Sequence, residues 1–210
     1  MATPNSTAVP LYKVVLVGDI GVGKTSVYTR YQKDFFDPIR TPTFGVDNFI
    51  EELYVDEKRC RLNIWDTAGL ERTGSLTSHY YHSAQAVALL YAVDELNSLN
   101  IILHWIEDAE RYAPYAAKFL VANKIDLDKD DWEVEEMKAQ LFMESNNIIM
   151  KYNVSAKTGE GIKEMFEDIS RYLMQQKVAP TMPHGDPFHL SHEDSSLDLR
   201  KQKQFSLCSC

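Results

Sequence analysis

The stretch Gly18-Asp19-Ile20-Gly21-Val22-Gly23-Lys24-Thr25 has the spacing G-x-x-x-x-G-K-T and directly follows the apolar run at residues 14–17. A strand that leads into a glycine-rich turn and then a helix presents converging backbone N–H groups to phosphate oxygens. In such a loop the lysine reaches the terminal phosphates and the Thr25 hydroxyl can ligate Mg²⁺. A flexible glycine-rich turn is the alternative for the motif alone, and the preceding strand argues against it.

Short apolar runs alternate with helical patterns along the rest of the chain. The runs at residues 87–93 and 119–122 lack polar alternation, which is typical of parallel strands covered on both faces by helices. A polar turn at residues 56–58 separates two alternating segments and indicates an antiparallel hairpin at the sheet edge. We therefore expect an α/β fold with a six-stranded, mostly parallel sheet and helices on both faces. The predicted strands are 12–17, 46–55, 59–65, 87–93, 119–122 and 148–154, and the predicted helices are 24–32, 98–112, 132–144 and 161–175.

Composition places the chain among single-domain proteins. It has 210 residues, 44% of them hydrophobic, and 22 basic against 31 acidic residues give a net charge of −9, which disfavours nucleic acid as a partner. The three cysteines suggest no disulfide framework and fit a reducing cytosol. We predict a domain over residues 11–176 between disordered segments at 1–10 and 177–210. The first segment lacks the features of a secretory signal, and the tail histidines are spaced too irregularly to predict a metal site.

Three further motifs follow predicted strands in chain order. Asp66-Thr67-Ala68-Gly69 offers a carboxylate for Mg²⁺ and a glycine N–H for a terminal phosphate, and Thr43 in the loop at 34–45 offers the metal a second hydroxyl. In Asn123-Lys124-Ile125-Asp126, the Asp126 carboxylate can accept hydrogen bonds from N1–H and the exocyclic amine of guanine, a pairing that adenine lacks. Ser155-Ala156-Lys157 offers a backbone N–H for the guanine oxygen.

Together these motifs resemble those of the Ras superfamily of small GTPases and, within it, the Rab family, over residues 11–176 and the cysteine tail. The resemblance to Rab proteins depends on Phe44-Gly45-Val46-Asp47, Ile64-Trp65-Asp66-Thr67-Ala68-Gly69, His79-Tyr80-Tyr81 and Cys208-Ser209-Cys210. It implies a P-loop G domain that binds GTP or GDP with Mg²⁺. The implied phosphate-binding residues are Gly21, Val22, Gly23, Lys24, Thr25, Ser26 and Gly69. The implied guanine-binding residues are Phe36, Asn123, Lys124, Asp126, Ser155, Ala156 and Lys157, and the implied metal residues are Thr25, Thr43 and Asp66.

The resemblance also locates a catalytic centre at Lys24, Thr43, Gly69 and position 70, where the family has a water-orienting glutamine. Here that residue is Leu70, which cannot hydrogen-bond water. Ile20 occupies a position that many relatives fill with glycine or serine, and its branched side chain is expected to crowd the terminal phosphate. The sequence therefore predicts slow GTP hydrolysis.

The effector surface implied by the resemblance is an aromatic triad, of which the chain keeps Trp65 and Tyr80 but has Asn48 in place of phenylalanine. Either Phe49 replaces it through a shifted register, or the surface is altered, or the change is neutral drift; we favour alteration, because a one-residue slip turns Phe49 to the other face. For Trp65, packing under a loop and a docking role both remain open. The resemblance further implies prenylation of Cys208 and Cys210, against the alternative of two free thiols.

Three functions compete on these residues. The first is a monomeric GTP/GDP switch in vesicle and membrane trafficking, which recruits effector proteins in the GTP state and is served by an exchange factor and a GTPase-activating protein. It would sit peripherally on the cytosolic face of an endomembrane. The second is a scaffold that stays GTP-bound and hardly hydrolyses, favoured by Leu70 and Ile20. A P-loop kinase is the third, and the guanine-selecting Asp126 argues against it.

Overall fold

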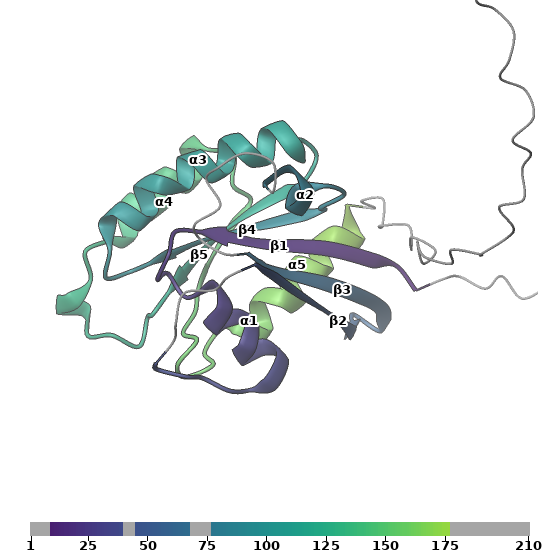
Figure 1. The fold of residues 1–210 in the computed structure, drawn as a ribbon, viewed down its shortest axis with the longest axis horizontal. Helices are drawn as coiled ribbons and strands as arrows, with labels where there is room; N and C mark the ends of the chain where they lie inside the picture. The colour runs from purple at the N-terminus through teal and green to yellow at the C-terminus, as the bar shows by residue number, and fades with distance from the viewer. Residues whose placement is uncertain (1–8, 40–44, 68–76, 177–210) are drawn as a thin grey trace, which may run out of the picture.

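A six-stranded sheet runs through the centre of the computed structural model, with helices on both of its faces (Figure 1). The strand order is β2-β3-β1-β4-β5-β6; β2 and β3 are antiparallel and the other neighbours are parallel. The structure describes residues 9–39, 45–67 and 77–176. The expected α/β fold is thereby confirmed. Its elements are β1 (Leu11–Gly18), α1 (Lys24–Lys33), β2 (Val46–Val55), β3 (Lys58–Thr67), α2 (Thr77–Tyr81), β4 (Ala86–Ala92), α3 (Leu96–Tyr112), β5 (Ala117–Asn123), the 3₁₀ helix η1 (Lys129–Asp131), α4 (Glu136–Ser145), β6 (Met150–Asn153) and α5 (Ile162–Gln175).

Two hydrophobic clusters lie on opposite faces of the sheet because neighbouring strand residues point to opposite sides. Along β1, Val14 and Leu16 join the cluster under α1 and α5, while Val15 and Val17 join the cluster under α2, α3 and α4. All seven residues of β4 are buried. This two-sided burial explains why the central strands read as continuous apolar runs.

The hairpin at the sheet edge is formed by β2 and β3 as expected. Asp56 and Glu57 form its turn with positive φ values of 50° and 61°, which match the twist of a two-residue hairpin turn. On β3, Cys60, Leu62 and Ile64 are buried in the α1–α5 cluster. The alternation therefore fixes which face of the hairpin meets the core.

Two helices differ from the sequence-based expectation. The helix predicted at 132–144 begins only at Glu136, since the backbone N–H groups of Glu133 and Val134 both donate to the Val93 carbonyl and hold this segment extended. The short helix α2 was not expected. Five residues are too few for a periodic pattern to be visible, and Tyr80 and Tyr81 are held by burial rather than by local propensity.

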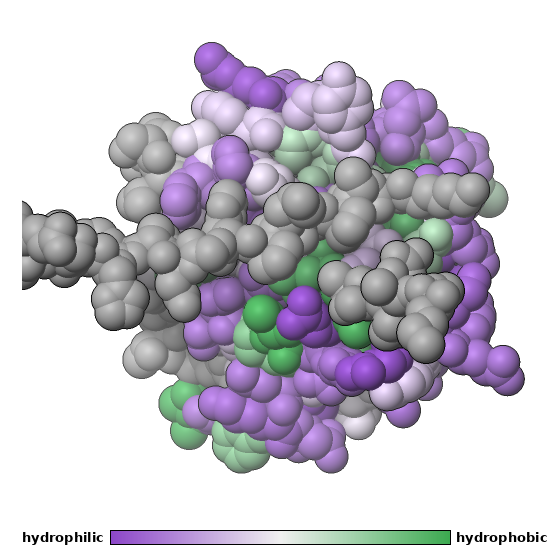
Figure 2. Space-filling view, turned by 90° about the vertical axis from the view of Figure 1, so that its right-hand side faces the viewer, coloured by the Kyte–Doolittle hydropathy of each residue, from purple (hydrophilic) through white to green (hydrophobic). Residues whose placement is uncertain are grey.

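Figure 2 shows one face of the molecule on which hydrophilic side chains surround small, separate apolar areas. This pattern agrees with the net charge of −9. Most of the large apolar side chains of the described residues lie instead between the sheet and the helices. These apolar side chains thus hold the helices to the sheet.

Candidate nucleotide-binding site

The predicted motifs that the structure describes converge at one edge of the sheet. β1 ends at Gly18, β3 at Thr67 and β5 at Asn123, and Ser155 follows β6 closely. These strands run parallel, so their carboxyl ends share one edge. The topology thereby brings together residues more than 130 positions apart in the sequence.

The loop after β1 holds Lys24 against its own backbone. Lys24 is 5% exposed, and its Nζ donates to the carbonyl oxygens of Gly18 and Asp19, each at 2.9 Å. The ammonium group is thereby fixed inside the curve of the loop. This is the position from which a lysine can meet the phosphates of a bound nucleotide.

Helix α1 begins immediately after Gly23, a residue with φ of 94° and no side chain to cap the helix. Its first turn is Lys24-Thr25-Ser26, which contains no acidic group. The N-terminal N–H groups and the positive end of the helix dipole are therefore suited to an anion supplied by a ligand. Gly21, Val22 and Gly23 complete the predicted cradle.

The end of β3 lies beside this cradle. Asp66 pairs with Leu16 of β1 and is 1% exposed, and the neighbouring Thr67 Oγ1 donates to the Leu16 carbonyl at 2.9 Å. A buried carboxylate next to a phosphate cradle is suited to charge compensation by a divalent cation. Asp66 could therefore hold Mg²⁺. The part of Thr25, in the first turn of α1, stays a prediction. Thr43, Gly69 and Leu70 lie outside the described residues, so their roles stay predictions.

Three of the predicted guanine residues, Asp126, Ser155 and Lys157, form one polar group. Asp126 Oδ1 accepts from Ser155 Oγ at 2.6 Å, and Asp126 Oδ2 lies 3.3 Å from Lys157 Nζ. Burial alone would raise the pKa of Asp126, but the hydrogen bonds from Ser155 and Lys157 and the Lys157 charge lower it overall. Asp126 is thus kept ionised, which a group that accepts from guanine requires.

Asn123 joins the guanine residues to the phosphate cradle. This side chain is 2% exposed; its Nδ2 donates to the Val22 carbonyl at 2.8 Å, and its Oδ1 accepts from the Ala156 N–H at 3.1 Å. One buried amide therefore bridges three segments of the site. Lys124, with φ of 70°, turns to form an ion pair with Asp94 at 3.0 Å, a partner that the sequence analysis did not identify.

Phe36, predicted to pack against the base, is half-buried against the cluster under α1 and α5. Its role toward the base stays a prediction.

Arg30 is a residue of the site that the sequence did not reveal. It contacts Ala156 and Lys157, which are 126 and 127 positions away, and no local sequence signal reveals such a partner.

The predicted effector residues differ in how exposed they are. Asn48 pairs directly with Trp65 across the hairpin and is exposed, whereas Phe49 lies on the other face, edge-on to Tyr28 at 5.1 Å between ring centroids. The register has therefore not slipped to bring Phe49 beside Trp65. Trp65 is half-buried with Lys13 Nζ 3.7 Å from its ring centroid, so it packs against the α2–α3–α4 side. Tyr80, which the effector prediction needs accessible, is only 6% exposed, because α2 packs onto this side.

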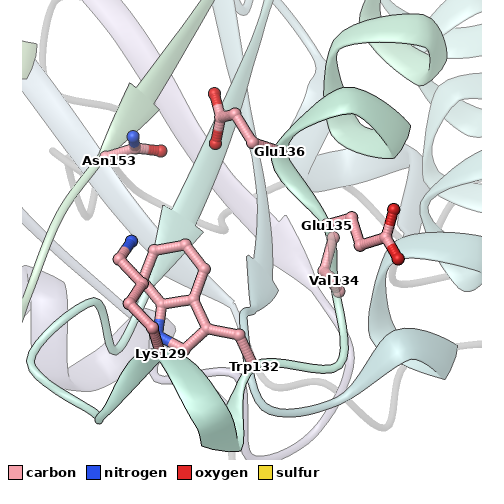
Figure 3. Close-up of a pocket in the computed structure, with 6 residues that line it drawn as sticks. All are labelled: Lys129, Trp132, Val134, Glu135, Glu136 and Asn153. Atoms are coloured by element: carbon pink, nitrogen blue, oxygen red, sulfur yellow. The ribbon is translucent and has the colours of Figure 1, made fainter.

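A hollow of about 470 Å³ lies between η1, the start of α4 and the end of β6 (Figure 3). It contains none of the predicted site residues. Lys129 Nζ lies 3.1 Å from the centroid of the Trp132 ring, so this face of the ring already contacts a cation of the chain itself. The hollow is therefore distinct from the site at the strand ends. Its lining residues are Lys129, Trp132, Val134, Glu135, Glu136 and Asn153.

Two other predictions concern the chain ends and the membrane. Cys208 and Cys210 lie outside the described residues, as do the two segments expected to be disordered, apart from residues 9 and 10. Among the described residues, no helix combines the length and apolar character that a membrane crossing needs. Cys60 is buried as a free thiol.

Comparison with known proteins agrees with this geometry. The model of the Ras family matches residues 13–175. The chain is 36% identical over 165 residues to the Ras-related protein Rab-18-B of Danio rerio, covering 78% of this chain and 79% of that protein. It is 34% identical over 188 residues to Rab-30 of Homo sapiens, covering 89% and 92%. With RABE1d of Arabidopsis thaliana it shares 32% identity over 202 residues, covering 95% and 93%. Family match, fold and site motifs agree, and the chain belongs to the Rab family of Ras-related small GTPases.

Proposed function

We propose that this protein is a GTP/GDP switch for membrane trafficking that binds its nucleotide with Mg²⁺ at the edge formed by β1, β3, β5 and β6. The observation that carries the proposal is the guanine group, in which Ser155 and Lys157 hold Asp126 ionised while Asn123 links this group to the phosphate cradle. The site would therefore select the base and hold the phosphates through one connected structure.

The predicted site residues divide into groups for the phosphates, the metal and the base. Lys24, the first turn of α1 and the loop from Gly21 would bind the phosphates, with Gly69 donating to the terminal one. Thr25, Thr43 and Asp66 would hold the metal, which would offset phosphate charge. Phe36, Lys124 and Ala156 would complete the base pocket. Ordering of the loops at 34–45 and 69–82 by GTP would then create the surface that effectors bind.

Slow hydrolysis is the second element of the proposal. A water in line with the terminal phosphate needs a group that orients it, and Leu70 offers no hydrogen bond. The Ile20 side chain is 45% exposed in the phosphate loop, so it is open to contact a ligand or an inserted arginine. We expect intrinsic turnover below the roughly 10⁻⁴ s⁻¹ typical of related GTPases.

Single-turnover hydrolysis tests this expectation. We expect the rate to increase stepwise from the unaltered chain to Leu70→Gln and to the Leu70→Gln/Ile20→Gly variant. An unaltered chain as fast as both variants would show that another group orients the water. The nucleotide that copurifies from cells separates the switch from the scaffold favoured by Leu70, because a scaffold would be recovered almost entirely with GTP.

Membrane attachment is proposed through prenyl groups on Cys208 and Cys210. Residues 177–210 contain four basic and four acidic residues, so the tail supplies no net positive charge to assist binding to anionic lipid. A single lipid chain binds only marginally, and two are therefore required. In cell fractionation, the Cys208→Ser/Cys210→Ser variant should move to the soluble fraction; retention on membranes would refute the anchor.

A further inference from the structure

Arg30 lies in the last turn of α1 and reaches the loop that carries Ser155-Ala156-Lys157. Its side chain is 16% exposed. Nε donates to the Ala156 carbonyl at 2.9 Å, and Nη2 donates to the Lys157 carbonyl at 2.6 Å. Two consecutive peptide groups of the guanine loop are therefore held by one planar guanidinium.

The bond to Lys157 continues toward the base-selecting carboxylate. In a trans peptide the carbonyl and the following N–H point in opposite directions, so fixing the Lys157 carbonyl also fixes the Thr158 N–H. That N–H donates to Ser155 Oγ at 3.1 Å, and Ser155 Oγ donates to Asp126 Oδ1 at 2.6 Å. Arg30 is thus connected to Asp126 by an unbroken series of hydrogen bonds.

A second arm of Arg30 holds the start of the loop at 34–45. Nη1 donates to the Asp34 carbonyl at 3.0 Å and to Asp34 Oδ1 at 2.9 Å, and Asp34 has left-handed φ and ψ of 49° and 38°. The Asp34 side chain is 94% exposed, so this ion pair is screened by water and contributes little. The bonds to the guanine loop therefore dominate the effect of Arg30.

We propose that Arg30 is a positioning residue for base recognition: it orients the 155–158 loop so that Asp126 is aimed at the exocyclic amine of a guanine base. The proposal rests on the guanine-nucleotide function proposed above. It predicts a difference between two nucleotides, which a purely structural role of Arg30 would not produce. Loss of Arg30 should weaken nucleotides that carry this amine more than a nucleotide that lacks it.

We test this difference with dissociation constants for GDP and inosine diphosphate (IDP), measured on the full chain at fixed Mg²⁺. IDP differs from GDP only by the missing exocyclic amine. The variants are Arg30→Ala and Arg30→Lys, the latter keeping the charge without the planar fork. Asp34→Ala removes the exposed ion pair with Arg30 and leaves the bond to the Asp34 carbonyl. Arg59→Ala is the matched control, because Arg59 forms an exposed ion pair with Glu52 on the hairpin.

We expect Arg30→Ala to weaken GDP about tenfold, the loss of roughly one well-made hydrogen bond, while IDP weakens less, so that the preference for GDP narrows. Arg30→Lys should give a GDP-to-IDP preference between those of the unaltered chain and Arg30→Ala. It provides the measurement if the alanine variant does not fold. Asp34→Ala and Arg59→Ala should keep the preference of the unaltered chain.

An unchanged GDP-to-IDP preference in both Arg30 variants would overturn the positioning role, even if their overall affinity fell. If the unaltered chain bound ADP as tightly as GDP, the proposed function would fail and this inference with it. A chain that selects GDP over ADP but shows no effect of Arg30 on the GDP-to-IDP preference would remove only the inference.

Discussion

Substituting alanine at Gly23 and at Gly21 compares two glycines of the same loop that differ in their surroundings. Both have positive φ, 94° at Gly23 and 80° at Gly21. A methyl group at Gly23 would lie 2.3 Å from Asn123 Nδ2, whereas at Gly21 it would have no atom of the described residues within 4 Å. The Asn123 amide would have to move away from Gly23→Ala but not from Gly21→Ala.

The magnitude follows from the bonds that Asn123 makes. A left-handed backbone costs alanine about 1–2 kcal/mol relative to glycine, and both variants share this cost. Displacing Asn123 also breaks its bonds to Val22 and Ala156, and each buried group left unpaired costs about 1–3 kcal/mol. We therefore expect Gly21→Ala to lower the free energy of unfolding by about 1–2 kcal/mol and Gly23→Ala by about 3–8 kcal/mol.

Urea unfolding followed by circular dichroism measures this difference, provided that the slope with urea is the same in both variants. Bound GDP adds to stability by mass action, so the comparison is made at two GDP concentrations. GDP dissociation rates from the same samples report on the site itself. Equal losses in the two variants would refute the argument, because they would show that backbone strain alone, and not the Asn123 contact, makes Gly23 necessary.

Asp126→Ala should weaken GTP by roughly 2–4 kcal/mol, because two guanine donors lose their acceptor, and comparable binding of ATP and GTP by the unaltered chain would contradict the assignment. Thr43→Ala should loosen residues 34–45 in the GTP form while largely sparing GDP binding; hydrogen exchange decides this, and equal protection with GTP and GDP would end the switch proposal. Burial lowers the pKa of Lys13 to about 8, so between there and its ordinary 10.5 the unfolded chain holds a proton that the folded chain has released. This group therefore makes stability rise with pH across that window. Between pH 7.5 and pH 10, urea unfolding should show the free energy of unfolding of the unaltered chain rising relative to that of Lys13→Met.

The central strands, the edge hairpin and the motifs after the strands could be predicted because each depends on local pattern. Continuous apolar runs such as β4 follow from two-sided burial, and the cradle before Lys24 follows from glycine spacing. The start of α4 could not be predicted. Its delay to Glu136 arises when Val93, some 40 positions earlier, accepts two backbone hydrogen bonds from the intervening segment.

Contacts within the site were hidden for the same reason. The ion pair of Lys124 with Asp94 and the bonds of Arg30 to the 155–157 loop join residues that only the fold brings together. For Trp65 the sequence left packing and docking both open, and the structure packs it toward the second of two clusters, one on each face of the sheet. Alternation identifies the face of a strand residue, but the helices that cover that face decide its exposure.

The Asn123 amide has a consequence for how the two halves of a nucleotide are bound. Because it bonds to Val22 in the cradle and to Ala156 in the base loop, ordering either segment removes part of the conformational freedom of the other. Guanosine and pyrophosphate supplied as separate molecules should therefore assist each other's binding. The binding free energy of the intact nucleotide would therefore exceed the sum for its two fragments. Its release would require both halves of the pocket to loosen together.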